Sequence, residues 1–560
     1  MNQHHGHEQK RVTGDRSAYL AQLCEPGRNW DLIVIGGGAS GLGIALEAVS
    51  RGYSVLLLER FDFAKGTSSR STKLVHGGVR YLAQGNIGLV REASIERGIL
   101  HRNAAHLVRN QVFLVPVFTG WERLKYTIGL KLYDWIAGGL SLGASEFVSR
   151  GETLRLLPGI RSAGLKGAVK YHDGQFDDAR LAINLAQTIW ELGGDAINYM
   201  EVTGINRNDS GEINGVMVRD SETGSSLYFK SPLIINATGV FVDGILRMAN
   251  DTHIDTVRVS QGVHLVLDKK FMPSSEALMI PETSDGRVLF VVPWHDKLVL
   301  GTTDTPVQNY SVEPVALEQE ISFILDTAAQ YLEKKPARED VLSVFAGLRP
   351  LAAPTGKKEK TKEISRSHKI LLGASGIYTM LGGKWTTYRK MGEDMINRIE
   401  QTKGWKKTKS VTSRLSIHGN NGTVVEKNDH NFSKGISGTL GESRSQNKSY
   451  DDDPLYWYGS DRENIETMIR NSGKDWISIR FGIHEETIRW SVRFEMARTV
   501  EDILARRTRV LFLDVREAGL LALPVATVLS VLLDKDQLWI NNEVEEFRKL
   551  CGFYLPRPVV

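Results

Sequence analysis

A lysine, a histidine, two glycines, an arginine and a tyrosine fall within the short run "STKLVHGGVRYL", residues 71–82. A cation binds an anionic group, an imidazole moves a proton near neutral pH, and glycine lets a ligand approach the backbone. The run therefore predicts a strip of chain that lines a reaction site. Two more positions carry similar chemistry. Arg349 stands in "GLRPL", and Lys384 lies between Gly383 and a helix that we expect to begin near Thr386.

Lys384 stands at the wrong end of its predicted helix for a surface lysine, because a basic group suits the C-terminal end of the helix dipole. We interpret it as a residue that stabilises developing negative charge; the alternative is a solvated lysine. The proton acceptor is harder to choose. His264 falls in the strand "GVHLVL" and His76 in a glycine turn, and either is also compatible with a structural histidine. We favour His264 as proton acceptor or substrate orienter and His76 as a residue near a cofactor.

A nucleotide-binding signature precedes the run at 71–82. Gly36, Gly38 and Gly41 have the spacing G-x-G-x-x-G after an apolar strand, and Glu59 ends the next strand. In such a βαβ unit the helix N-terminus binds a pyrophosphate and the acidic side chain binds a ribose. The motif alone does not distinguish NAD from FAD.

Two later glycine turns, "INATG" and "GGKWTTYR", favour FAD, because a cofactor of that length touches three distant segments of the chain. Each turn alone is also typical of a strand-to-helix connection. The candidate cofactor residues in these turns are Ala237, Thr238, Gly239, Gly383, Lys384 and Thr386.

Hydrophobic patterning divides the chain into several parts. Residues 1–30 are expected to form a loosely packed leader. Residues 31–403 mix βαβ patterns with β-rich runs, which predicts an α/β FAD-binding domain interleaved with a substrate domain. The sheet of that second domain is expected to be antiparallel and to come mainly from residues 110–175 and 255–350.

The last third of the chain changes in composition. Residues 404–453 are rich in Ser, Asn, Lys and Gly, and we interpret them as a polar linker or mobile loop. Residues 454–560 return to helical patterns and predict a C-terminal helical domain. The apolar run 518–533 is short of the ~18 residues that span a bilayer and contains Pro524, so we interpret it as a buried helix rather than a membrane-dipping segment.

Composition narrows the class of protein. The chain has 560 residues, a net charge of +4 and two cysteines, Cys24 and Cys551. The length supports two or three domains, and the small charge argues against a nucleic-acid binder. Two cysteines far apart argue against a disulfide framework or a cysteine-based metal site and fit a reducing cytoplasm. No metal site is predicted.

Seven segments resemble those of aerobic, quinone-linked, FAD-dependent glycerol-3-phosphate dehydrogenases, in the same order. They are "IVIGGGASGLGIALEAVSRG", "FAKGTSSRSTKLVHGGVRYL", "DDARL", "INATG", "VPWHDKLVLGTTDT", "FAGLRPL" and "GGKWTTYRKM". The run "RFEMARTVEDILARRTRVLFLD" is similar to the family's terminal helical domain. The resemblance covers about residues 30–400 and 450–550.

The resemblance implies a glutathione-reductase-type FAD-binding domain, an antiparallel-sheet substrate domain and a C-terminal all-helical domain. It also implies oxidation of sn-glycerol 3-phosphate to dihydroxyacetone phosphate by hydride transfer from C2 to flavin N5. The implied phosphate-binding residues are Arg80 and Arg349, with Tyr81 as a hydroxyl partner and Lys384 beside them. With the residues chosen above on their own chemistry, the candidate catalytic residues are His264, Lys384 and Arg349.

The strip at 67–78 is then expected to pass along the cofactor. Its candidate residues, with those of the first glycine turn, are Gly36, Gly38, Ser40, Gly41, Glu59, Thr67, Ser68, Ser69, Ser71, Lys73, Leu74, His76, Gly77 and Gly78. Three residues depart from the family pattern. Val240 and Phe241 replace Pro-Trp after "NATG", and Trp385 replaces the more usual leucine.

The resemblance implies that electrons leave for a membrane quinone or, in oxidase members, for oxygen. A quinone acceptor requires the membrane surface, for which Arg506, Arg507, Arg509 and the segment 518–533 are the candidates. The expected location is cytoplasmic, peripheral on the inner face of the cell membrane, and a homodimer is left open. The rival functions are an FAD-dependent amine or amino-acid oxidase and a non-catalytic flavin-binding sensor or membrane scaffold.

Overall fold

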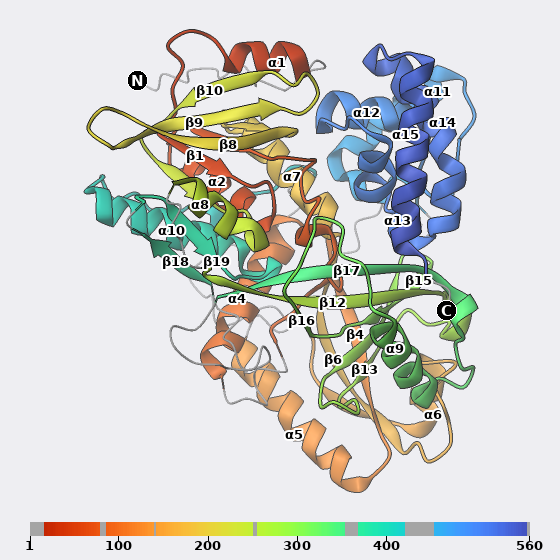
Figure 1. Cartoon of the computed structure of the whole chain (residues 1–560). Coiled ribbons are helices and arrows are strands. Elements are labelled where there is room, and N and C mark those ends of the chain that lie inside the picture. Colours follow the sequence, from red (N-terminus) through yellow and green to blue (C-terminus); the bar gives the residue numbers. More distant parts are fainter. Residues whose placement is uncertain are drawn as a thin grey trace, which may run out of the picture.

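The computed structural model describes residues 16–78, 86–138, 142–249, 255–352, 368–373, 375–420 and 453–556. Within these ranges the chain forms three sheets with flanking helices, and the C-terminal helices gather on one side (Figure 1). The predicted phosphate-binding residues Arg80 and Tyr81 lie outside the described residues.

A six-stranded sheet carries the nucleotide-binding signature. Its strands are β1 (Leu32–Ile35), β2 (Val55–Leu58), β7 (Asp195–Ile197), β11 (Ile234–Asn236), β18 (Lys369–Leu372) and β19 (Tyr378–Leu381). The order is β18-β19-β11-β1-β2-β7, and only the pair β18–β19 is antiparallel. β1, β2 and β11 are buried along their whole length, as parallel strands covered on both faces require.

The two faces of this sheet have different covers. On one face Leu32 and Val34 pack with α2 (Ala39–Ser50), α7 (Asp178–Glu191) and α10 (Tyr388–Lys403). On the other, Ile33 and Ile35 pack against the antiparallel sheet of β8 (Met200–Arg207), β9 (Ile213–Asp220) and β10 (Ser226–Lys230). Alternate residues of β1 are thus buried in two separate hydrophobic cores, one on each face of the sheet.

A ten-stranded sheet forms the second part, and all its pairs are antiparallel except β13 with β4. Its strands are β3 (Leu74–Val75), β4 (Val108–Val117), β5 (Glu146–Ser149), β6 (Gly167–Phe176), β12 (Val257–Asp268), β13 (Ala277–Ile280), β14 (Leu289–Trp294), β15 (Lys297–Gly301), β16 (Thr305–Val307) and β17 (Val341–Ala352). The long pair β12 and β17 crosses the middle of the molecule (Figure 1). The remaining helices before the C-terminal group are α1 (Arg16–Leu23), α4 (Ile87–Asn103), α5 (Gly120–Ala137), α6 (Arg150–Leu156), α8 (Val242–Ala249) and α9 (Glu318–Tyr331).

The C-terminal helices pack on this large sheet. They are α11 (Arg462–Ser472), α12 (Glu485–Glu495), α13 (Val510–Leu513), α14 (Val515–Leu533) and α15 (Gln537–Cys551). Trp294 and Phe345 of the sheet share a core with Phe512 of α13, so the helices cover one face of the substrate sheet.

The prediction of a buried helix at 518–533 holds for one face of α14. Ala522 and Val525 are fully buried, whereas Leu520 and Val531 are 71% and 79% exposed. Among the described helices, α14 alone is long and apolar enough to cross a membrane, and 44% of its most apolar window is buried inside the protein.

The predicted loose leader is wrong for residues 16–30. Arg16 of α1 donates to Asp220 Oδ1 over 2.9 Å, and Trp30 Nε1 donates to Asp195 Oδ2 over 2.8 Å. The segment is polar because its side chains pair with other elements.

The predicted linker is likewise wrong for residues 404–420. The Trp405 ring lies 5.1 Å from that of Tyr53, and Ile417 is buried. His418 hydrogen-bonds Asp461 over 2.8 Å, so this segment joins the FAD-binding part to the C-terminal helices. Residues 421–452 lie outside the described residues.

Candidate active site

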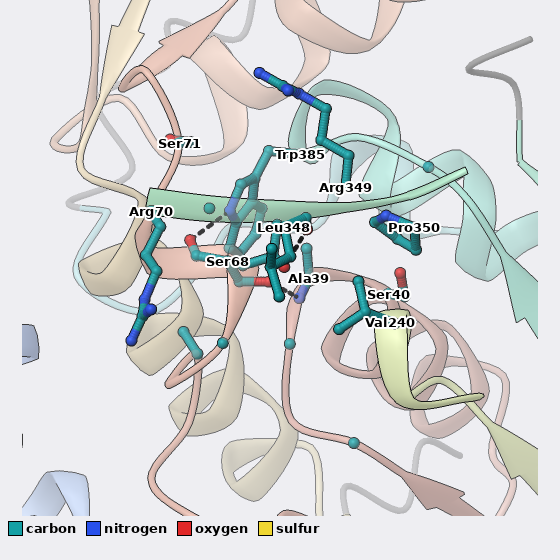
Figure 2. Close-up of a pocket in the computed structure, with 18 of the residues that line it drawn as sticks. Ala39, Ser40, Ser68, Arg70, Ser71, Val240, Leu348, Arg349, Pro350 and Trp385 are labelled. Atoms are coloured by element: carbon teal, nitrogen blue, oxygen red, sulfur yellow. Dashed lines mark hydrogen bonds between the residues drawn. The ribbon is translucent and has the colours of Figure 1, made fainter. Parts of the chain in front are cut away.

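A cavity of about 650 Å³ opens where four parallel strands end (Figure 2). Its wall comes from the turns that follow β1, β2, β11 and β19 and from the strands β12 and β17. Carboxyl ends of parallel strands share one edge of a sheet, which is where open α/β folds bind ligands. The fold therefore brings together segments more than three hundred residues apart, from Gly36 to Thr386.

The glycines of the first turn have no room for a side chain. A Cβ on Gly41 would lie 1.8 Å from the Gly36 oxygen. Gly36 has φ +109°, and a Cβ there would lie 2.8 Å from the Ala237 oxygen. The turn can therefore bring the N-terminus of α2 directly onto the cavity, where Gly38 and Ser40 line the wall.

The acidic residue of the signature is held by backbone groups. Gly37 N donates to Glu59 Oε2 over 2.6 Å and Phe61 N donates to Oε1 over 2.9 Å. Burial raises the pKa of Glu59, and these two hydrogen bonds oppose that rise. The carboxylate is thereby fixed at the end of β2, on the cavity wall.

These features fit FAD. The N-terminus of α2 has no side-chain cap on Gly38, which leaves its first turn suited to a pyrophosphate. Glu59 is placed for a ribose, and the Gly382–Gly383 turn, with φ of +71° and +111°, brings Lys384 to the cavity wall.

Trp385 ties two of the predicted cofactor segments together. Its Nε1 donates to the Ser68 oxygen over 2.7 Å, and Ser68 Oγ accepts from Ala39 N over 2.9 Å (Figure 2). Thr67 Oγ1 donates to the Leu348 oxygen of β17 over 2.5 Å. A leucine side chain at position 385 has no N–H group. The tryptophan that departs from the family pattern therefore adds one side-chain hydrogen bond to the cavity wall.

Most of the predicted cofactor residues line the cavity. They are Gly36, Gly38, Ser40, Glu59, Thr67, Ser68, Ser71, Leu74, His76, Ala237, Thr238, Gly239, Gly383, Lys384 and Thr386. The predicted residues Gly41, Ser69, Lys73, Gly77 and Gly78 are described but lie behind the wall.

Lys73 points away from the cavity. Its Nζ donates to the Ser69 oxygen and to Asp178 Oδ2, each over 2.7 Å, and the side chain is fully buried. Burial, together with the nearby Arg509 guanidinium, lowers the pKa of Lys73 to about 7. The prediction that Lys73 binds the cofactor is therefore not supported by its position. Its neighbours Ser71 and Thr72 line the cavity instead.

Arg349 lines the cavity from β17, opposite Ser260 of β12. Its guanidinium donates to the Thr303 oxygen over 3.1 Å and to Thr302 Oγ1 over 3.2 Å. A Cβ on Gly262 would lie 2.2 Å from the guanidinium, so that glycine makes the space for it. The side chains of Arg349 and Arg70 extend in different directions (Figure 2), and Arg70 pairs with Glu313 over 2.6 Å.

His264 is almost fully buried and lines the same cavity. Its Nε2 lies 2.8 Å from Thr72 Oγ1, and its ring stacks on Phe345 with centroids 4.8 Å apart. Burial, with Lys73 and Arg349 nearby, lowers the pKa of His264 well below its usual value. The imidazole is therefore neutral at physiological pH, the form that accepts a proton.

Among the residues of this site that sequence reasoning missed are Thr72, Gly262 and Gly301. A Cβ on Gly301 would lie 2.3 Å from His264 Cδ2, so it clears space for the imidazole as Gly262 does for Arg349. A glycine inside a strand pattern, as in "SQGVH" and "LVLGTT", is the available signal, because it marks a close approach. Thr72 carries no comparable signal.

Val240 and Phe241 pack beside the cavity. Val240 joins a small core with Val257 and Leu348, and the Phe241 ring lies 5.9 Å from that of Tyr310. The departure from Pro-Trp is thus accommodated by apolar contacts that both β12 and β17 provide.

The three arginines that were candidates for membrane contact, with a solvated face as the alternative, are buried. Arg506 and Arg507 each donate to Asp62 Oδ2 over 2.5 Å, and Arg509 donates to Asp178 Oδ1 over 2.8 Å. The prediction is wrong because an arginine-rich run on a helix pairs here with carboxylates of another part of the chain.

Comparison with known proteins agrees with this geometry. A family model described as FAD dependent oxidoreductase matches residues 31–389, and one described as C-terminal domain of alpha-glycerophosphate oxidase matches residues 410–538. A protein named glycerol-3-phosphate dehydrogenase, mitochondrial, from Homo sapiens is 35% identical over 548 residues, which are 94% of this chain and 73% of the relative. The chain belongs to the FAD-dependent glycerol-3-phosphate dehydrogenase family. FAD is its cofactor.

Other members show the same extent of likeness. Glycerol-3-phosphate dehydrogenase SDP6, mitochondrial, from Arabidopsis thaliana is 36% identical over 93% of this chain and 85% of its own length. The solved glycerol-3-phosphate dehydrogenase from Bacillus halodurans, complexed with FAD, has a TM-score of 0.74 at 24% identity and covers 98% of this chain and 100% of its own. The predicted fold class of this family member is confirmed, and so is the prediction that it is an FAD-dependent oxidoreductase.

Proposed function

We propose that this protein oxidises sn-glycerol 3-phosphate to dihydroxyacetone phosphate and passes the electrons to a quinone. One observation carries the substrate: a guanidinium, Arg349, and a neutral buried imidazole, His264, line the same cavity as the FAD-binding turn. A guanidinium also binds the carboxylate of an amino acid, so the phosphoester is preferred because the relatives are named glycerol-3-phosphate dehydrogenases.

The reaction removes a hydride from C2 and a proton from O2 of the substrate. FAD, when bound, supplies the hydride acceptor. Arg349 is proposed to hold the phosphate through two N–H groups, which fixes C2 in the cavity. His264 is proposed to accept the O2 proton, since burial keeps it neutral. Lys384 precedes a helix N-terminus and is proposed to stabilise the negative charge that develops. Arg80 and Tyr81 remain proposed phosphate partners.

An apolar end of the cavity supports a flat, apolar electron acceptor. Phe113, Tyr171, Met279 and Phe290 line it, and the Phe113 and Tyr171 rings stack with centroids 5.1 Å apart. Stacked aromatic rings and a methionine bind planar apolar groups well. Oxygen is the second candidate acceptor, because the family model that matches residues 410–538 is named after an oxidase.

We further propose that α5 attaches the protein to a membrane as a peripheral element, with the inner face of the cell membrane as the expected location. Its exposed apolar residues recur on one stripe of the helix, and Trp121 and Trp135 at its two ends are 72% and 78% exposed. Lys125 and Lys131 flank the stripe, as in helices that lie in an anionic interface. Figure 1 shows α5 at the lower edge of the molecule. The apolar residues of the stripe are Trp121, Leu124, Ile128, Leu132 and Trp135.

The substrate is tested by mixing the FAD-loaded protein anaerobically with sn-glycerol 3-phosphate, glycerol or an amino acid. We expect only the phosphoester to bleach the flavin absorbance. Bleaching by the amino acid and not by the phosphoester would overturn the proposal. Addition of oxygen or of a short-chain quinone to the reduced protein then identifies the electron acceptor. Rapid formation of peroxide would favour oxygen as the acceptor and thus an oxidase.

A further inference from the structure

A buried cluster joins the C-terminal helices to the loop beside the substrate. Asp178, the first residue of α7, accepts hydrogen bonds from Ser71 Oγ over 2.7 Å, from Lys73 Nζ over 2.7 Å and from Arg509 over 2.8 Å. Lys73, Asp178 and Arg509 are each at most 2% exposed. Charges so deeply buried need their partners, so the three side chains hold one arrangement.

Arg509 also contacts the backbone of the loop formed by residues 69–73. The same NH2 group donates to the Ser69 oxygen over 2.9 Å, so it holds both the loop and Asp178. Arg509 and Lys73 both have left-handed backbone, with φ of +66° and +63°. A non-glycine residue keeps such a conformation only where its surroundings hold it.

The cluster lies one contact away from the reacting groups. None of its three charged side chains lines the cavity, whereas Ser71 and Thr72 do. Thr72 hydrogen-bonds His264, and the Phe345 ring that stacks on His264 lies 5.3 Å from Lys73 Nζ. The imidazole is thus connected to the cluster through a hydroxyl on one side and through an aromatic ring on the other.

We propose that Asp178 and Arg509 are positioning residues that fix residues 69–73, so that Thr72 orients His264 toward the substrate. The C-terminal helices thereby complete the active site, although Arg509 lies outside the residues that match the oxidoreductase model. The inference rests on the proposed role of His264 as proton acceptor.

The test compares Asp178→Asn, Thr72→Val and the double variant in the FAD-loaded protein. Glu495→Gln is the matched control, because Glu495 is equally buried, pairs with Arg180 of the same α7 and does not contact residues 69–73. Three readouts are needed: the rate of flavin reduction by sn-glycerol 3-phosphate under rapid mixing, the FAD content, and amide hydrogen exchange of residues 69–73.

We expect Asp178→Asn and Thr72→Val each to slow flavin reduction about 10-fold or more, with FAD content unchanged, and exchange at residues 69–73 to rise in Asp178→Asn. The double variant should be no slower than the slower single variant, because both changes act on one contact. Glu495→Gln should retain the wild-type rate. If Asp178→Asn does not fold, Arg509→Lys, which keeps the charge but loses the forked geometry, replaces it in the same cycle.

Two results would overturn the inference: rates for Asp178→Asn and Arg509→Lys equal to that of Glu495→Gln, or effects of positions 72 and 178 that multiply. A parallel His264→Gln variant distinguishes a failure of the proposed proton acceptor from a failure of the positioning role of Asp178 and Arg509. If it reduces flavin at the wild-type rate, the proposed proton acceptor is wrong and the inference falls with it. If it is slow while Asp178→Asn is not, only the inference is wrong.

Discussion

Thr72 Oγ1 lies 2.8 Å from His264 Nε2, and this contact joins a loop of the FAD-binding part to a central strand of the substrate sheet. The two residues are 192 positions apart in the chain. Their contact holds a buried, neutral imidazole against the cavity.

His264→Gln should slow flavin reduction by sn-glycerol 3-phosphate about 100-fold, the usual loss for a general base. Because burial lowers the pKa of His264, the neutral form persists to lower pH than for an ordinary histidine. The wild-type rate should therefore not fall as pH drops through about 6.5. Rapid-mixing rates across this range check both points; a fall centred near 6.5 would contradict the neutral buried state.

Arg349→Ala should raise the KM for sn-glycerol 3-phosphate about 10- to 100-fold, because a charge-assisted pair of hydrogen bonds to phosphate is lost. FAD should stay bound, since Arg349 contacts Thr302 and Thr303 rather than the glycine turns. Steady-state kinetics and flavin absorbance measure the two effects. An unchanged KM would remove Arg349 from the proposed phosphate site. Arg338→Ala, on the surface and paired with Glu318, is the matched arginine control.

Glu59→Gln should weaken FAD binding and destabilise the protein by about 1–3 kcal/mol. The amide retains one acceptor oxygen, so one of the two backbone N–H groups, of Gly37 or Phe61, loses its partner. Titration of the apoprotein with FAD and thermal unfolding give the two quantities. Equal FAD affinity in both proteins would show that the carboxylate does not reach the cofactor.

His418 should make the stability depend on pH. Burial alone would lower its pKa, but hydrogen bonds to Asp461 and Glu191 raise the pKa of His418 to about 9. A raised folded-state pKa stabilises fully below about pH 6.5, and that stabilisation, on the order of 1–3 kcal/mol, is lost as pH rises to about 9. His418→Gln should remove this dependence. The free energies of unfolding of the wild type and of His418→Gln at about pH 6.5 and about pH 9 test this prediction. An equal change in free energy between the two pH values in both proteins would contradict it.

Membrane attachment should depend on α5 and not on α14. Replacing Leu124 and Ile128 by serine should reduce binding to vesicles that contain anionic lipid, about 10-fold or more, because two apolar side chains no longer enter the interface. The matched control replaces the exposed Leu520 and Val531 of α14 by serine and should leave binding unchanged. Vesicle sedimentation measures both, and loss of binding in the control alone would reassign the surface to α14.

The nucleotide-binding turn could be predicted from local residues, because G-x-G-x-x-G followed by Glu59 encodes a local geometry of strand, turn and helix. The wall residues near each turn, such as Thr67, Ser68 and Thr238, could also be predicted, because they follow from local order. Family resemblance adds the phosphate-binding role of Arg349, whereas His264 is a candidate because its imidazole titrates near neutral pH.

The partners of the buried charged side chains could not be predicted from local residues, because they are brought together by the folding of distant segments. Arg506, Arg507 and Arg509 have the spacing of a basic helix surface, yet each is buried against a carboxylate far away in sequence. Lys73 is likewise buried and paired with Asp178. Residues 404–420 are polar in composition, yet they pack on the rest of the chain, as the contact of His418 with Asp461 shows. Composition reports how polar a segment is, but burial follows from long-range pairing, which local spacing does not encode.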